Sequence, residues 1–408
     1  MLKKFLSSEL GKGALILFIA INLFNFFNFI FHISMARLLT PSEYGILATL
    51  MALISIYAIP SEAIQNIISR YTSQFNVKKE DNKIKFLLNK SLKKTTTVSS
   101  ILFFVLVMLG FLFSWILQIN FWLITITNLF IFLAIITPIT RGILQGRKKF
   151  GALGINMIID SSLKLFFAIS LVLFGFKVFG AITGALLGST ASLIFAFYAN
   201  KDILEKKEEK VSFNGVYKTS IPYFITMAII LFSFSLDIIL SKIFFSPEIA
   251  GQYAGLSMLG KIIFLGTVAI GKAMFPLTSE KHDTNKDSSR LFGKSMIIVI
   301  ALCGIAILIY GFFPELVIKM LYGAQYLEVA PYLVYSAISL SFLSLSNLIF
   351  IYNLSTKKIK HSQFLFIFLI IEIILLSMFH NNLLEYTLAF MVSNTIMFIG
   401  SFFFVKNK

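Results

Sequence analysis

The sequence predicts an all-α integral membrane protein with twelve transmembrane helices in two six-helix lobes. The first reason is composition. Hydrophobic residues make up 57% of the chain and charged residues 13%, whereas a soluble domain carries about 25% charged residues. The second reason is an internal repeat, because residues 36–45 and 241–250 are similar and each follows a long apolar run. Lys242 lies 205 residues after Arg37, close to half of the 408-residue chain.

The apolar runs define the elements. A spanning helix needs about 20 mainly apolar residues, and we assign twelve such segments: 12–35, 44–68, 96–117, 120–144, 152–175, 178–199, 217–243, 250–275, 292–313, 325–353, 362–380 and 383–405. An even number of spans in each half gives both halves the same orientation. We therefore expect an N-terminal lobe (1–200), a linker (201–215) and a C-terminal lobe (216–408), with the two lobes related by a pseudo-two-fold axis along the membrane normal.

Basic residues predict the orientation. Of the 36 Lys and Arg residues, 28 lie between the spans or at their ends on the side of the N-terminus, and five lie deeper inside spans. Three lie on the opposite side: Arg37, Lys177 and Lys319. The positive-inside rule then places both termini in the cytoplasm of a multi-pass cell-membrane protein. The net charge of +17 is spread over several short segments, which does not favour nucleic-acid binding. Residues 83–94 alternate lysines with apolar residues at helical spacing, which predicts a helix on the anionic inner leaflet.

Several function classes lack their motifs in this sequence. We find no Cys/His metal spacing, no Walker-type phosphate loop and no nucleophile elbow. The one cysteine, Cys303, lies in an apolar run and is expected to be a small buried residue. We therefore predict no cofactor, no metal site and no enzymatic activity.

Two lysines in span 250–275 are the strongest candidates for binding an anion. Lys261 and Lys272 are eleven residues apart, close to three helical turns, so they share one face about 16 Å apart. No acidic residue of that span neutralises them, and an ionisable group at bilayer depth costs about 2.5–3.5 kcal/mol. We expect both to face water or an anionic substrate. The alternatives are pairing with carboxylates of other spans and, for Lys272, extension to the cytoplasmic interface.

Span 152–175 has a polar stripe. Asn156, Asp160 and Lys164 follow i, i+4, i+8 spacing, which indicates either a structural Asp160–Lys164 ion pair or the wall of a cavity. Arg141 lies one turn inside the end of the preceding span, so it either lines the same cavity or reaches the interface. The predicted substrate-binding set is therefore Lys261, Lys272, Arg70, Arg141, Lys164, Arg37, Lys242, Asn25 and Asn156.

Titratable groups inside the spans are candidates for ion coupling. They are Asp160, Asp237, Glu62, Glu372 and, more weakly, His32. His32 lies 205 residues before Asp237, so the two halves place titratable groups at corresponding positions. A purely structural hydrogen bond remains the alternative for His32. The repeated small residues Gly180, Gly184 and Gly188 predict close helix packing, with a hinge as the alternative.

Three segments resemble a known family. Residues 36–45 (Ala-Arg-Leu-Leu-Thr-Pro-Ser-Glu-Tyr-Gly) look like the signature of Wzx-type polysaccharide flippases, in the multidrug/oligosaccharidyl-lipid/polysaccharide exporter superfamily. Residues 142–150 are similar to the family's segment between spans 4 and 5. Tyr253-Ala254, Lys261 and Phe275-Pro276 fit its second half. The resemblance covers essentially the whole chain.

The resemblance implies two six-helix bundles around a cationic cavity that opens alternately to each side. It implies translocation of a polyprenyl-diphosphate-linked oligosaccharide to the outer leaflet for cell-surface polysaccharide biosynthesis, driven by a proton or sodium gradient, with glycan polymerase machinery as a further partner. Two departures limit it: the chain lacks the extra pair of spans of lipid II flippases, and its first lobe lacks the carboxylate cluster of drug/cation antiporters.

Three other functions remain open. A drug or cation antiporter has the same fold but favours acidic cavities over Lys261 and Lys272. A membrane glycan polymerase or ligase needs an extracytoplasmic loop to hold its acceptor, and the outer loops here are short. A structural scaffold does not need buried charges.

Overall fold

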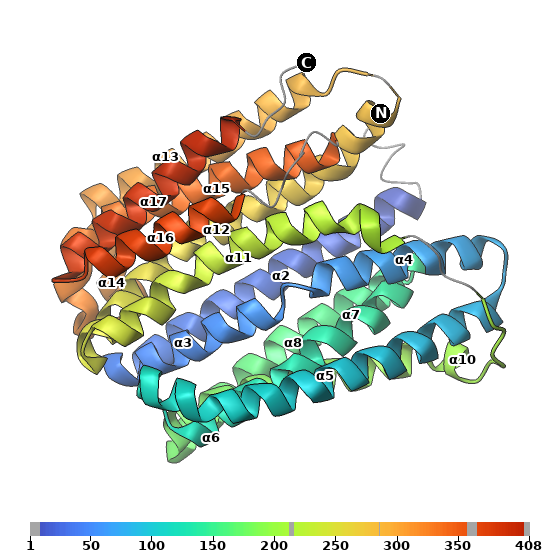
Figure 1. Ribbon diagram of the computed structural model, residues 1–408, viewed down its shortest axis with the longest axis horizontal. Helices are drawn as coiled ribbons and strands as arrows, with labels where there is room; N and C mark the ends of the chain where they lie inside the picture. Colours follow the sequence, from blue (N-terminus) through green and yellow to red (C-terminus); the bar gives the residue numbers. More distant parts are fainter. Residues whose placement is uncertain (1–8, 212–215, 285, 357–364, 404–408) are drawn as a thin grey trace. The chain divides into compact units, whose positions relative to one another are not determined.

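The chain is almost entirely helical in this computed structural model, which describes residues 9–211, 216–284, 286–356 and 365–403 (Figure 1). All regular secondary structure within these residues is helical, which confirms the predicted fold class. The last four residues of the predicted linker lie outside the described residues. The same holds for seven of the lysines that predict the orientation: Lys3, Lys4, Lys357, Lys358, Lys360, Lys406 and Lys408.

The helices fall into two compact units. The first unit comprises residues 1–38 and 53–220, and the second comprises residues 39–52 and 221–408. The first contains α2 (Glu9–Leu38), α4 (Ser61–Val77), α5 (Asp81–Leu117), α6 (Phe121–Asn128), α7 (Phe130–Gly146), α8 (Phe150–Leu171), η1 (Val172–Phe176), α9 (Lys177–Ala199) and α10 (Lys201–Leu204). The second contains most of α11 (Val216–Phe244), then α12 (Pro247–Asp283), α13 (Ser289–Phe312), α14 (Pro314–Leu321), η2 (Ala324–Tyr332), α15 (Leu333–Ser355), α16 (Phe366–Met378) and α17 (Leu383–Phe403). Helix α3 (Pro41–Tyr57) begins in the second unit and ends in the first.

Each predicted span coincides with one helix or with consecutive helices of the described chain. Ten stretches are long and apolar enough to cross a membrane. One of them, residues 150–199, contains both α8 and α9, and the chain leaves helical geometry between them at Gly175, where φ is +89°. Helix α16 is a shorter apolar helix of 13 residues.

The span at 44–68 is interrupted at Pro60. Helix α3 ends at Tyr57, and α4 begins at Ser61 after a three-residue turn. Proline lacks the N–H that would continue the helical hydrogen bonding. The Ser61 hydroxyl then donates to the Ala134 carbonyl of α7 at 2.6 Å, which fixes the start of α4 on its neighbour.

Residues 83–94 do not form a separate helix, contrary to the expectation of a segment lying on the inner leaflet. They are the first turns of α5, which runs unbroken from Asp81 to Leu117. Their apolar side chains Ile84, Leu87 and Leu88 are buried in a core cluster that also contains residues of α4, α7 and α10. The alternating pattern therefore marks a buried face of the protein, and lysines occupy other positions of the same turns.

The predicted linker begins as the short helix α10, which is tied to the loop between α7 and α8. Arg147 donates to both carboxylate oxygens of Asp202, at 3.0 and 2.6 Å, and Lys149 Nζ lies 3.1 Å from each of them. These hydrogen bonds, led by those from Arg147, hold the pKa of the Asp202 carboxyl well below its usual value. The ion pairs fix the first residues of the linker onto the first unit.

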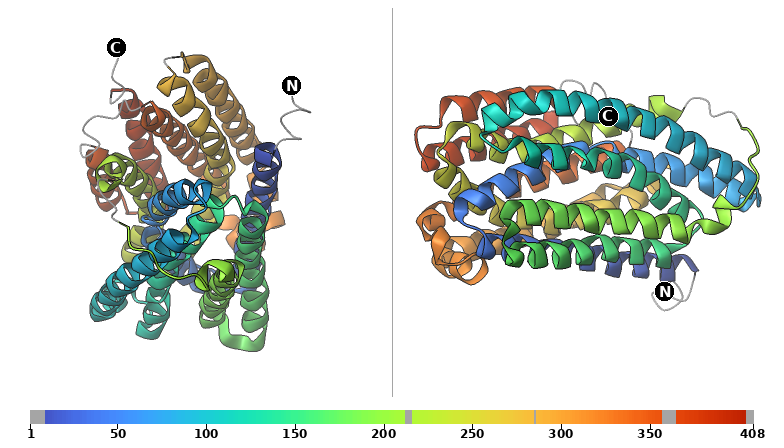
Figure 2. Two further views of the ribbon diagram at one scale, coloured as in Figure 1. Left: turned by 90° about the vertical axis from the view of Figure 1, so that its right-hand side faces the viewer. Right: turned by 90° about the horizontal axis from the view of Figure 1, so that it is seen from below.

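Close packing of α9 on α8 uses the small-residue stripe, which confirms the packing interpretation. The two helices lie side by side and antiparallel in Figure 2. A Cβ atom at Gly184 would lie 2.4 Å from the Ala168 nitrogen, and one at Gly188 would lie 2.3 Å from the Lys164 nitrogen. Only glycine permits the α9 backbone to approach α8 this closely. Gly188 therefore contacts the turn of α8 that carries Lys164.

Candidate functional site

The first unit buries a polar centre where α7, α8 and α9 meet. Arg141 of α7 donates from Nε to Asn156 Oδ1 at 2.6 Å and from one terminal nitrogen to Asp160 Oδ2 at 2.8 Å. Ser189 of α9 donates to the other Asp160 oxygen at 2.7 Å, and the Ser192 hydroxyl lies 3.2 Å from the Arg141 guanidinium. The side chains of Arg141 and Asp160 are 16% and 17% exposed, so the ion pair is largely sheltered from solvent.

This arrangement corrects the predicted Asp160–Lys164 ion pair. Asp160 is engaged by Arg141 and Ser189. Lys164 turns to α2, where its ammonium donates to Asn28 Oδ1 at 3.0 Å and lies 4.2 Å from the centre of the Phe31 ring. In the described part of the chain, no carboxylate lies within salt-bridge distance of Lys164. Lys164 is therefore a half-buried cation contacted by an amide and an aromatic ring.

Asn28 is a site residue that the sequence analysis missed. It lies on α2 between the predicted candidates Asn25 and His32, and the three follow i, i+3, i+7 spacing on one helical face. This spacing could have identified Asn28 as a candidate from the sequence. His32 contacts Phe31 edge to face, with ring centroids 5.3 Å apart.

The second unit buries a different ion pair. Lys261 of α12 donates to Asp237 Oδ1 of α11 at 2.9 Å, and their side chains are 1% and 0% exposed. Ser257 and Tyr253, on the same face of α12, both donate to Asp237 Oδ2, and the Tyr386 hydroxyl of α17 donates to the Asp237 carbonyl at 2.7 Å. The expectation that Lys261 faces water or substrate is wrong for this structure, because a carboxylate of a neighbouring helix neutralises it.

A second carboxylate lies in the same unit. Glu372 of α16 is fully buried and accepts a hydrogen bond from the Ser233 hydroxyl of α11. Its Oε1 atom has no hydrogen-bond partner within the described residues. Glu372 is close enough to Lys261 and Asp237 for their charges to interact. The centre of the second unit therefore contains one lysine and two carboxyl groups.

The remaining predicted residues lie outside these hydrogen-bonded centres. Lys272 shares α12 with Lys261 but is exposed, as are Arg37 and Arg70, whereas Lys242 is buried at the end of α11. Glu62, Asn25 and His32 are partly exposed. No group of three or more His, Cys, Asp or Glu side chains among the described residues could hold a metal ion.

Residues 39–45, the part of the segment 36–45 that belongs to the second unit, have a packing role there. Tyr44 is fully buried, and its hydroxyl lies 3.2 Å from that of Tyr322, with the Tyr326 ring centred 6.0 Å from its own. A Cβ atom at Gly251 would lie 1.9 Å from the Pro41 carbonyl oxygen, so the backbone of α12 touches the start of α3. A Cβ atom at Gly45 would in turn lie 2.8 Å from the Gly251 Cα atom. These contacts explain why Tyr44 and Gly45 stand in the segment 36–45 and why a glycine directly follows the segment 241–250.

The family is identified by a match to a family sequence model, whose description is polysaccharide biosynthesis protein. It matches residues 10–282, or 273 of the 408 residues. The chain belongs to this family. No curated protein sequence matches the chain significantly.

Solved structures establish the fold of this family member. It is similar to the inward-facing conformation of a multidrug resistance MATE family transporter of the MOP superfamily, with a TM-score of 0.72 and 13% identity over 92% of this chain and 93% of the other. The outward-facing conformation of such a transporter gives 0.69 and 13% over 95% and 92%. A MOP superfamily transporter from Pyrococcus furiosus Vc1 (DSM3638), described as having a binding pocket of reverse polarity that suggests a different function, gives 0.66 and 14% over 95% and 93%.

Proposed function

We propose that the protein is a secondary transporter of the cell membrane that flips a polyprenyl-diphosphate-linked oligosaccharide to the outer leaflet by alternating access. Membership of a polysaccharide biosynthesis family and the MATE fold support this function. The observation that carries it is the charge of the centre in the first unit. Arg141 and Lys164 bring two positive charges there, and Asp160 compensates only one.

An excess cation in a sheltered site suits a diphosphate. Coulomb attraction grows as water is excluded, so Lys164 attracts an anion more strongly than a surface lysine does. Its present contacts, an amide oxygen and a ring face, are neutral and can be exchanged for phosphate oxygens. Asn28, Asn156 and Ser189 are hydrogen-bonded within the protein in this conformation. In this proposal their amide and hydroxyl groups exchange these partners for sugar hydroxyls when the site opens.

The centre in the second unit provides the coupling in this proposal. Lys261 is engaged by Asp237 in this conformation and becomes available to the substrate only when that ion pair opens. Protonation of Asp237 removes the negative charge that holds Lys261. Glu372, with one oxygen unpartnered among the described residues, is the second proton acceptor. A proton gradient can thereby switch Lys261 between its ion pair with Asp237 and contact with the substrate.

The test is transport by purified protein in liposomes, using a labelled polyprenyl-diphosphate glycan and a fluorescent drug cation in parallel. Wild-type protein should flip the glycolipid and should not transport the drug. Lys164→Gln removes the excess charge and should reduce flipping at low glycolipid concentration about 10- to 150-fold, because a hydrogen bond to a charged group contributes about 1.5–3 kcal/mol. Lys207→Gln, at an exposed position in the same unit, is the control and should behave as wild type.

Drug or cation antiport is the second candidate, and one observation favours it. Glu372 is a buried carboxyl group with an unpartnered oxygen within the described residues, which is a suitable contact for a cation. The same liposomes decide between the two functions. If the wild-type protein transports the drug but not the glycolipid, and Glu372→Gln abolishes drug transport, drug antiport replaces our proposal.

A further inference from the structure

One face of α5 is exposed along most of the helix. Residues that follow Lys90 by 4, 7, 11, 14, 18, 22 and 25 positions lie close to the same helical face. The exposed members are Lys90, Lys94, Thr97, Ile101, Phe104, Met108, Leu112 and Trp115. The stripe changes abruptly from basic to apolar: Met108 is 77% exposed and Trp115 is 79% exposed.

The length of the apolar part matches a bilayer. From Val98 to Trp115 the helix rises about 26 Å, close to the hydrocarbon thickness of about 30 Å. The basic part begins about two turns before Val98 and ends one turn before it, so a bilayer that covers the apolar part would place these lysines near the lipid headgroups. Trp115 lies at the opposite end of the stripe, where aromatic residues commonly mark the other interface.

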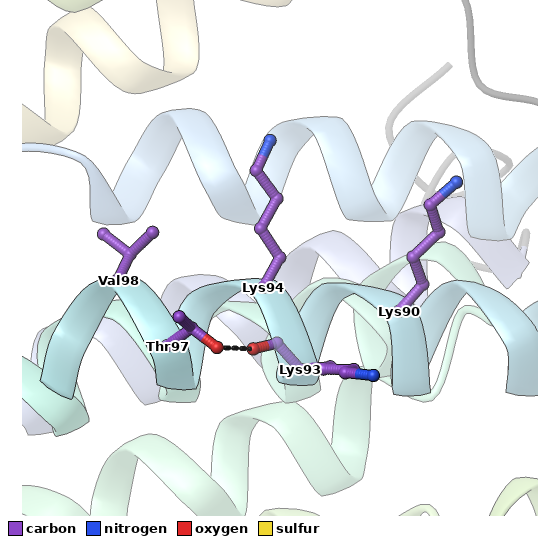
Figure 3. A pocket seen from close by; sticks show the side chains of 5 residues that line it. All are labelled: Lys90, Lys93, Lys94, Thr97 and Val98. Carbon is purple, nitrogen blue, oxygen red and sulfur yellow. Dashed lines mark hydrogen bonds between the residues drawn. The ribbon is translucent and has the colours of Figure 1, made fainter. Parts of the chain in front are cut away.

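The basic end of the stripe surrounds an open hollow. Lys90, Lys93, Lys94, Thr97 and Val98 line it, with a volume of about 390 Å³ (Figure 3). The Thr97 hydroxyl donates to the Lys93 carbonyl at 3.0 Å, and its oxygen remains able to accept or share a bond. The side chains of the three lysines, Thr97 and Val98 thus border a space with a mainly apolar lining, and Val98 joins it to the exposed apolar strip. The Lys90 ammonium lies 5.4 Å from the centre of the Phe86 ring.

We propose that this hollow binds the headgroup phosphate of an anionic phospholipid, whose acyl chains lie along the apolar strip of α5. Charge complementarity selects an anionic lipid over a zwitterionic one, and the adjoining strip selects a lipid over a free phosphate. The site lies within the first unit and does not depend on the transported substrate. If these lysines only fixed the topology, lipid binding would show no preference for an anionic headgroup and would not depend on positions 90, 93 and 94.

The experiment measures lipid binding to the purified full-length protein in neutral detergent by native mass spectrometry. Phosphatidylglycerol and phosphatidylcholine of identical chains are titrated in turn. The test variant is Lys90→Gln/Lys93→Gln/Lys94→Gln. The matched control is Lys78→Gln/Lys79→Gln/Lys207→Gln, which removes the same charge from exposed positions of the same unit. A charge-preserving triple Arg variant at 90, 93 and 94 verifies that the site tolerates substitution.

We expect phosphatidylglycerol to bind the test variant at least about tenfold more weakly than wild type, since each basic residue near an anionic headgroup contributes favourably. The control and the Arg variant should bind like wild type, and glycerol phosphate without acyl chains should not compete. Equal losses in test and control variants would show a general charge effect and overturn the proposal. Wild-type binding by the test variant, equal binding of both lipids, or competition by glycerol phosphate would overturn it as well.

Discussion

At the scale of single residues, the two units neutralise their buried charges differently. In the first unit Arg141 pairs with Asp160 and leaves Lys164 to an amide and a ring. In the second, Lys261 and Asp237 form a closed pair with almost no exposure. Removing one member of a buried pair leaves an uncompensated charge, so the stability effects of these residues must be separated from their effects on transport.

Lys261→Ala should therefore destabilise the protein as well as stop transport. Losing one partner of a buried ion pair costs about 3–5 kcal/mol, and Asp237 would remain buried without its cation. The double variant Lys261→Met/Asp237→Asn removes both charges and should recover most of the thermal stability in detergent while glycolipid flipping stays absent. If the double variant flips at the wild-type rate, the ion pair is structural only.

The carboxyl group of Asp202 should make stability depend on pH. Its ion pairs with Arg147 and Lys149 lower its pKa in the folded protein, chiefly through the Arg147 hydrogen bonds. A lowered folded-state pKa means that the stabilisation is complete above the unfolded value of about 3.9 and is lost as the pH falls below it. The melting temperature of wild type should exceed that of Asp202→Asn at pH 6, and the difference should shrink toward pH 3. A constant difference would contradict this.

At the scale of elements, glycine positions decide how closely helices approach. The α8–α9 pair depends on Gly184 and Gly188, and the contact of α12 with the start of α3 depends on Gly251. For residues 83–94, by contrast, the sequence pattern does not distinguish between two structures. Their alternation of lysine and apolar residues suits a leaflet surface and a protein surface equally well, because either buries one face of a helix. Only the packing of Ile84 and Leu88 against α4 and α7 distinguishes them.

Gly188→Ala should disturb both packing and the Lys164 centre. The added methyl group would overlap the backbone of α8 at the Lys164 nitrogen, 2.3 Å away. Overpacking of this kind costs about 1–3 kcal/mol. Gly151→Ala is the matched control on α8, since a Cβ there meets nothing within 4 Å, and it should leave the melting temperature unchanged or slightly higher. Equal melting temperatures for the two variants would contradict the close-packing argument.

At the scale of the whole molecule, the orientation in the membrane stays a prediction from the charge distribution. In a Cys303→Ala background, a membrane-impermeant maleimide added to intact cells should label Ser246→Cys and miss Lys207→Cys until the cells are opened. Both positions are exposed in the structure. Labelling of position 207 in intact cells would overturn the cytoplasmic assignment of the termini. The predicted rotational symmetry of the two lobes likewise stays a prediction.

The amino-acid sequence was sufficient to predict the fold class and the helical segments. Hydrophobic length and the proline and glycine positions are local properties, and each acts within one helix or one turn. The position of a polar residue within an apolar span is also a local property, so the sequence shows which residues need partners. They are Arg141, Asn156, Asp160, Lys164, Asp237, Lys261 and Glu372. The partners of these residues follow from the packing of the helices. Asp160 could pair with a lysine one turn away on α8, and instead pairs with Arg141 of α7. Lys261 has no carboxylate on its own helix and finds Asp237 on α11. The choice among partners depends on which faces of different helices meet, and the periodicity of one helix contains no information about that.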